Sequence, residues 1–107
     1  MSRTNSDWHE VASVDELNDD EAQCVHAGDC QIALCRIDGQ FYALDDICTH
    51  EYASMSDGFI DGDNIECPLH QAAFHIPTGK VISPPADEDL KTYPTKTENG
   101  KVYVQIS

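Results

Sequence analysis

The chain has 107 residues with six basic and twenty acidic side chains, so its formal net charge at pH 7 is -14. This length fits one domain with a modest core. A surface of this sign repels phosphates, which argues against a nucleic-acid partner. The acidity suits either a partner with a basic docking face or adaptation for solubility and salt, and both interpretations stay open.

Hydropathy argues against three further classes of protein, namely disordered, membrane-spanning and secreted ones. Hydrophobic residues make up 40% of the chain, too many for a disordered segment. No apolar run approaches the roughly 20 residues of a membrane-spanning helix. The N-terminal MSRTNSDWHEV carries no apolar stretch typical of a secretory signal. We therefore expect a cytoplasmic protein with no membrane partner.

The first half of the chain predicts short strands joined by turns. Ser13 and Glu16 match a capping box, so one helical turn is expected from Val14 to about Asn18. Asp38-Gly39 between two β-rich runs predicts a tight hairpin with three cross-strand pairs, Arg36–Phe41, Cys35–Tyr42 and Ala33–Leu44. The expected strands are 7–11, 22–27, 30–37 and 40–46.

The C-terminus predicts a second hairpin. Asn99-Gly100 joins 91–98 to 101–106 and pairs Thr97 with Val102, Thr95 with Val104 and Tyr93 with Ile106. Apolar residues on both faces of the strands are expected where a sheet wraps into a barrel or sandwich. The expected fold is all-β, a small antiparallel barrel or sandwich. Residues 1–46 and 91–107 form its scaffold, and the segment between them is an insertion.

Five cysteines, an odd number in a chain expected to be intracellular, argue against a disulfide framework. Cys24, Cys30 and Cys35 lie in alternating apolar segments and are expected to be small buried hydrophobic residues.

The acidic run Asp19-Asp20-Glu21 is expected to be a solvated loop.

The remaining two cysteines each precede a histidine. Cys48-Thr49-His50 is followed by sixteen residues and then by Cys67-Pro68-Leu69-His70. Thiolates and imidazoles suit zinc, copper or an iron–sulfur cluster rather than calcium or magnesium. A hairpin of 59–60 and 65–66 around the turn 61–64 would bring the two pairs together. A Cys/His catalytic pair would leave the second pair unexplained.

These residues resemble the Rieske [2Fe–2S] motif. The likeness covers essentially the whole chain and extends to flanking residues, namely Ser56-Asp57-Gly58, Phe74, Thr78-Gly79 and Pro84-Pro85-Ala86. The resemblance implies a single Rieske domain over residues 1–107, with a cluster-binding subdomain of two loops at about 47–86. It also implies one [2Fe–2S] cluster, with Cys48 and Cys67 on one iron and His50 and His70 on the other.

The resemblance also indicates a low reduction potential. In Rieske domains of cytochrome bc complexes a disulfide joins the ligand loops, but the corresponding positions here are Ala53 and Leu69. High-potential members place hydroxyl donors to the cluster sulfurs where this chain has Ala72 and Phe74. Five acidic residues and no basic residue lie between Glu51 and Glu66. We therefore expect a potential of roughly -150 mV, the bottom of the Rieske range.

The chain as a whole is similar to the Rieske-type ferredoxins of bacterial aromatic-ring-hydroxylating dioxygenase systems. In that family a flavin-dependent reductase oxidises NADH and passes single electrons through the ferredoxin to the terminal oxygenase. The resemblance thus implies a soluble electron carrier rather than an enzyme. An alternative is a small Rieske electron-transfer subunit of another oxidoreductase, such as a nitrite-reductase-like assembly.

Overall fold

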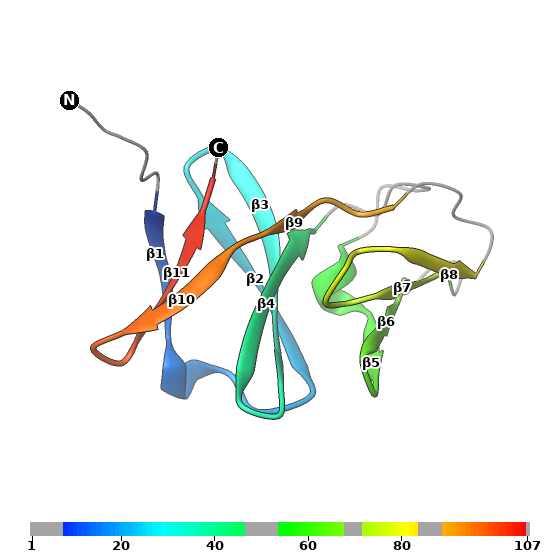
Figure 1. Ribbon diagram of the computed structural model, residues 1–107, viewed down its shortest axis with the longest axis horizontal. Coiled ribbons are helices and arrows are strands. Elements are labelled where there is room, and N and C mark those ends of the chain that lie inside the picture. The colour runs from blue at the N-terminus through cyan, green and yellow to red at the C-terminus, as the bar shows by residue number, and fades with distance from the viewer. Residues whose placement is uncertain (1–7, 47–53, 68–71, 84–88, 107) are drawn as a thin grey trace.

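The computed structural model describes residues 8–46, 54–67, 72–83 and 89–106. These residues form antiparallel strands in three sheets and two single turns of 3-10 helix, η1 (Val14–Glu16) and η2 (Met55–Asp57) (Figure 1). The strands are β1 (Trp8–Ser13), β2 (Glu21–Ala27), β3 (Cys30–Ile37), β4 (Gln40–Asp45), β5 (Phe59–Asp61), β6 (Asn64–Glu66), β7 (Ala73–His75), β8 (Val81–Ser83), β9 (Thr92–Tyr93), β10 (Thr95–Glu98) and β11 (Lys101–Gln105).

The three sheets lie side by side, with the sheet of order β2-β3-β4-β9 between the other two (Figure 1). The sheet of order β1-β11-β10 flanks it on one side and the sheet of order β5-β6-β7-β8 on the other. The expected all-β architecture is confirmed. No helix in the described part of the chain is long and apolar enough to cross a membrane.

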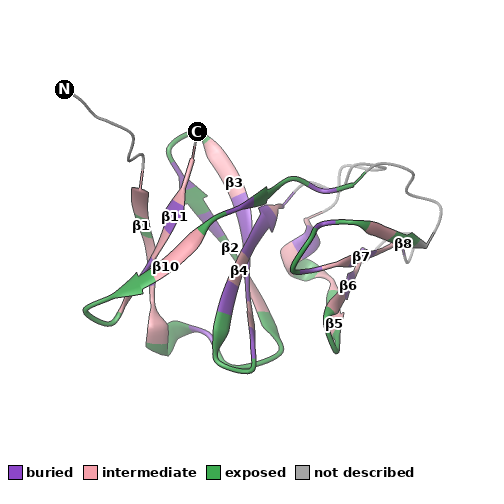
Figure 2. Ribbon diagram, viewed as in Figure 1, coloured by how far each residue is buried: buried purple, intermediate pink, exposed green. Residues whose placement is uncertain are grey.

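Strands β3 and β4 carry most of the buried residues of the middle sheet (Figure 2), and they contribute to a core on each of its faces. Alternate residues of β3 point to opposite faces, so Ile32 and Leu34 enter the core shared with β1 and β11. Ala33 and Cys35 enter a second core, which packs against the sheet of β5 to β8. This two-sided burial explains the apolar residues on both faces of the predicted strands.

Both tight hairpins form as predicted. Asp38 and Gly39 have φ angles of 51° and 80°, and Asn99 and Gly100 have φ angles of 53° and 77°. Two successive residues with positive φ make the turn that matches the twist of a hairpin. The predicted register is confirmed for Arg36–Phe41, Cys35–Tyr42, Ala33–Leu44, Thr97–Val102 and Thr95–Val104.

The predicted pairing of Tyr93 with Ile106 is wrong. Tyr93 belongs to β9 and pairs with Ala43 of β4 in the middle sheet. Pro94 separates β9 from β10 because it has no N–H to donate to a ladder, although its carbonyl accepts the N–H of Gln105 at 3.0 Å. The chain therefore changes sheet at Pro94.

The structure also corrects the prediction for two of the three scaffold cysteines. Cys35 is buried, but Cys30 is only half-buried and Cys24 is exposed. Cys24 lies on β2, which has a neighbouring strand on one side only, so alternation along the strand does not ensure burial.

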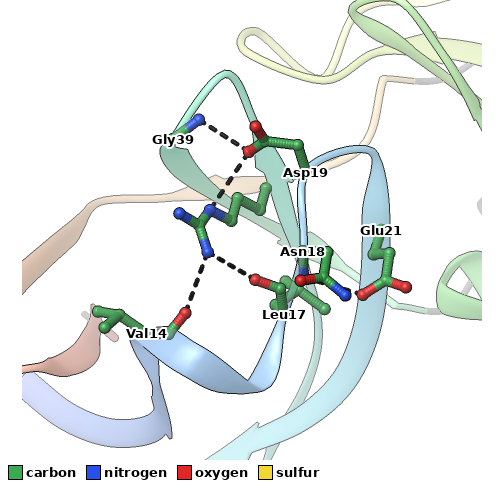
Figure 3. A network of polar contacts seen from close by, with 7 residues as sticks. Val14, Leu17, Asn18, Asp19, Glu21 and Gly39 are labelled. Carbon is green, nitrogen blue, oxygen red and sulfur yellow. Dashed lines mark hydrogen bonds and ion pairs between the residues drawn. The ribbon is translucent and has the colours of Figure 1, made fainter.

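The helical turn and the acidic run meet at one guanidinium group (Figure 3). Arg36 donates to the carbonyls of Val14 at 3.1 Å and Leu17 at 2.7 Å, and its Nε lies 3.3 Å from Asp19 Oδ1. The same carboxylate oxygen accepts the N–H of Gly39 at 2.9 Å. The turn is shorter than expected, and Asp19 links loops rather than being only solvated.

The third sheet contains more structure than the sequence predicted. The hairpin of β5 and β6 is confirmed, but its turn is shorter than the predicted 61–64, because Asp61 pairs with Asn64 and leaves a two-residue turn. Strands β7 and β8, which were not predicted, extend this hairpin into a four-stranded sheet. One face of this sheet carries Ile65 and Phe74, both fully buried against the middle sheet.

Candidate metal centre

One of the four candidate ligands lies among the described residues. Cys67 follows β6, is 1% exposed and has a free thiol. Cys48, His50 and His70 lie outside the described residues, as do Glu51, Ala53, Leu69, Gln71 and the segment 84–86. The predicted ligand set is therefore placed through the residues that flank each ligand segment.

Both ligand segments are closed at their base by a backbone hydrogen bond. The N–H of Met55 donates to the carbonyl of Asp46 at 2.5 Å, which closes the segment that contains Cys48 and His50. The N–H of Cys67 donates to the carbonyl of Ala72 at 2.7 Å, which closes the segment that contains His70. Asp46 is thus held next to Met55, and Cys67 next to Ala72, at the two ends of each ligand segment.

These two closed bases belong to one core. Met55, Cys67 and Ala72 are buried in the same hydrophobic cluster as Phe74 and Leu44. Burial of each large side chain contributes about 1.5–3 kcal/mol. The core therefore holds both closed bases on the same side of the middle sheet.

Asp46 is the one fully buried charged side chain among the described residues. Its carboxylate accepts Gln31 Nε2 at 2.5 Å and the N–H of Ser56 at 2.8 Å. Burial alone would raise the pKa of this carboxyl, but the hydrogen bonds from Gln31 and Ser56 outweigh burial and lower it. Asp46 is therefore a carboxylate at neutral pH.

Sequence reasoning missed this residue, although a signal was available. Asp46 comes two residues after Leu44, and residues two apart on a strand share a face. Leu44 is fully buried in the core beneath the ligand segments, so the same alternation predicts that Asp46 turns inward.

Backbone hydrogen bonds hold the junction at which the chain passes from the third sheet back to the scaffold. The N–H of Leu90 donates to the carbonyl of Gly79 at 2.8 Å, and the N–H of Asp45 donates to the carbonyl of Lys91 at 2.9 Å. Gly79 has φ of +76°, and a Cβ added there would lie 2.2 Å from the carbonyl oxygen of Leu90. This junction therefore requires glycine.

The two positions at which this sequence lacks a hydroxyl donor to the cluster are both fully buried. Ala72 and Phe74 each have 0% exposure and offer no side-chain donor toward the ligand segments. His75, next along β7, contacts Thr78 Oγ1 through Nδ1 at 2.9 Å. This contact ties His75 to the turn that follows β7.

The described residues fit an iron–sulfur cluster. A thiolate at Cys67 would be surrounded by apolar side chains of its core, where an unpaired negative charge is costly. A positively charged metal compensates that cost, and a donor set of cysteine and histidine suits iron or zinc.

A family model decides between these metals. The model of the Rieske [2Fe-2S] domain matches residues 7–94. The chain belongs to the Rieske family. Its cofactor is thus a Rieske-type [2Fe–2S] cluster rather than a structural zinc ion.

Comparison with individual relatives shows which kinds of Rieske protein this chain is similar to. The chain is 42% identical over 99 residues to the ferredoxin component of the naphthalene 1,2-dioxygenase/salicylate 5-hydroxylase systems of Ralstonia sp., covering 92% of this chain and 95% of that protein. It is 37% identical to a chain in a solved complex of reduced oxygenase and oxidised ferredoxin in carbazole 1,9a-dioxygenase, with a TM-score of 0.87 and coverage of 94% of each chain.

A third likeness concerns the fold alone. The putative NADH-dependent nitrite reductase small subunit from Mycobacterium tuberculosis is 24% identical, with a TM-score of 0.84 and coverage of 94% of this chain and 95% of that one. The ferredoxin components are the more similar relatives. The chain is accordingly a Rieske ferredoxin, an electron-transfer protein rather than a catalyst.

Proposed function

We propose that this chain carries single electrons to the terminal oxygenase of a ring-hydroxylating dioxygenase system. We further propose that it receives them from a flavin-dependent ferredoxin reductase that oxidises NADH, and that it acts in the cytoplasm. The similarity to ferredoxin components over more than nine-tenths of the chain supports the first step. The acidic surface, which favours association with basic partners, supports both steps.

We assign the ligands of the cluster to Cys48, His50, Cys67 and His70. When bound, the cluster supplies a one-electron couple. The two thiols bind one iron and the two imidazoles bind the other. The observation that carries this assignment is that each Cys-His segment starts or ends on the same buried core, at Met55, Cys67 and Ala72.

Residues next to the ligand segments influence the reduction potential of the cluster. The fully buried Ala72 and Phe74 withhold the hydroxyl donors that would stabilise the reduced state, which favours a low potential. A small, transient docking surface suits a carrier that must release each partner. Asp57 and Asp61 are exposed near the second core, and we propose that they, together with Glu51, face the partners.

A second candidate function is a Rieske subunit of a nitrite-reductase-like assembly. The likeness to the small subunit of that kind concerns the fold, whereas the ferredoxin components are similar in sequence as well. Turnover reconstituted with reductase and oxygenase components discriminates between the two functions.

Metal analysis of air-free preparations tests the ligand assignment. We expect two iron and two sulfide ions per chain. His50→Ala and His70→Ala should each lose most of both, because each removes one of two nitrogen donors. His26→Ala is the matched control, since His26 is exposed on β2 and should leave the metal content unchanged. Full iron and sulfide content in both ligand variants would refute the assignment.

A further inference from the structure

The buried carboxylate of Asp46 has no role in the ligand set. Its exposure is 0%, and a buried charge is costly unless it is paired or fully hydrogen-bonded. The ion pairs of the described residues join Arg36, Lys96 and Lys101 to other acids. Asp46 instead receives neutral donors, the amide of Gln31 and the N–H of Ser56. Its negative charge is therefore kept without a cation among the described residues.

The same residue fixes both ends of the first ligand segment. Its carbonyl accepts the N–H of Met55, its carboxylate accepts the N–H of Ser56, and its own N–H donates to the carbonyl of Gln31 at 3.1 Å. Gln31 lies on β3, a strand of the middle sheet. Asp46 thus joins the start of the segment, its end and the middle sheet.

Asp46 also lies close to a proposed ligand. Cys48 is two residues further on, and two residues of extended chain span at most about 7 Å. Solvent screens a fully buried charge much less than an exposed one. At an effective dielectric constant of about 20, a unit charge about 10 Å away changes a one-electron equilibrium by roughly tenfold.

We propose that Asp46 is a positioning residue for the first cluster-binding segment and that its buried negative charge lowers the reduction potential of the cluster. This inference rests on the proposed role of Cys48 and His50 as ligands. The carboxylate holds the end of the segment through Ser56 and disfavours the addition of an electron nearby.

Asp46→Asn removes the negative charge of the side chain but can keep its hydrogen bonds. Asparagine has the same shape, its oxygen can still accept from Ser56, and a rotated Gln31 amide can accept from its nitrogen. We expect the variant to keep its iron and sulfide. In a redox titration, the ratio of reduced to oxidised protein at fixed potential should rise about tenfold, which is an upward shift of about 59 mV for one electron.

Two controls isolate the buried charge. Asp63→Asn removes an exposed carboxylate four residues from Cys67, so solvent screening should leave the potential nearly unchanged. Gln31→Leu removes one donor but keeps the charge, so the potential should not rise. An equal rise in Asp63→Asn, or no rise in Asp46→Asn, would overturn the proposed electrostatic role.

Asp46→Ala tests the positioning role by a separate measurement. Without an acceptor for Ser56, iron and sulfide per chain should fall below half, whereas Asp63→Ala should keep both. Full metal content and an unchanged EPR spectrum in Asp46→Ala would contradict the inference. Failure of the ligand assignment would look different, because His50→Ala would then keep its iron and sulfide.

Discussion

Two thiols of this chain differ in accessibility although both lie on paired strands. Cys24 is exposed on the edge strand β2, and Cys35 is fully buried on β3. Burial, and secondly the charge of Asp46, raises the pKa of the Cys35 thiol to about 12. Burial and Asp46 also raise the pKa of Cys24. An acid with a raised pKa keeps its proton to higher pH, so both thiols stay protonated at neutral pH.

Alkylation of the folded, cluster-loaded protein tests this difference. Iodoacetamide reacts with thiolates. Labelling of Cys24 should rise as the pH increases from 8 to 10, because more of this exposed thiol ionises. Cys35 should stay unlabelled at both pH values, because it is inaccessible and titrates near 12. Peptide mass spectrometry reports both sites.

The unfolded chain is the control for this experiment. In urea both cysteines should react at similar rates, since the burial that separates them is lost. Labelling of Cys35 as fast as Cys24 in the folded protein would contradict the packing described for the core that contains Cys35.

At the scale of elements, local signals predicted the structure wherever the turn determines the pairing. Asp38-Gly39 and Asn99-Gly100 set the register of two hairpins because both residues of each turn accept positive φ. Tyr93 was misplaced because its partner is Ala43, fifty residues earlier, and no local signal specifies that contact. The sequence did contain one relevant signal, because Pro94 cannot donate a hydrogen bond to a strand ladder and so indicates a break there.

The candidate site was predictable in a different way. The spacing of Cys48, His50, Cys67 and His70 leads to the proposed donor set without any knowledge of the strands around them. Strands β7 and β8 were not predicted, because three residues are too few to show alternation, and the pairing depends on burial of Phe74. Asp46 was missed because aspartate is seldom fully buried.

The junction between the third sheet and the scaffold can be tested with two glycines. Gly79 and Gly100 have nearly equal φ angles of +76° and +77°, but only Gly79 has backbone within 4 Å of an added Cβ. Gly100→Ala should cost about 1 kcal/mol through backbone strain. Gly79→Ala carries the same strain and a clash with Leu90, so it should cost about 2 kcal/mol more.

Thermal unfolding of the two cluster-loaded variants measures this difference. Gly79→Ala should lower the midpoint clearly more than Gly100→Ala. Equal shifts in the two variants would show that the carbonyl of Leu90 moves away at little cost, and the close approach at Gly79 would then have no structural importance.

At the scale of the whole molecule, the charges are unevenly distributed. Between Arg36 and Lys80 the chain contains no lysine or arginine. The cations of the ion pairs among the described residues are Arg36, Lys96 and Lys101, and they lie on strands of the scaffold sheets. On β5, Phe59 is 69% exposed and lies between the exposed residues Asp57 and Asp61. This part of the surface suits a basic partner with a small apolar contact.

Charge reversal tests this surface. Asp57→Lys/Asp61→Lys should slow reduction by the reductase about tenfold at low salt, and the difference should shrink as salt screens the charges. Asp15→Lys/Asp29→Lys is the matched control, because it makes the same change in net charge at exposed scaffold positions. Stopped-flow absorption measures both rates. Equal slowing in the two variants would indicate a general effect of net charge rather than a docking surface.

The central claim is that this chain is a low-potential Rieske electron carrier, and an EPR-monitored redox titration of the air-free protein tests it most directly. The account predicts a single one-electron transition of a [2Fe–2S] centre with a midpoint of roughly -150 mV. The absence of a signal in reduced protein, or a midpoint above about +100 mV or near -400 mV, would contradict it.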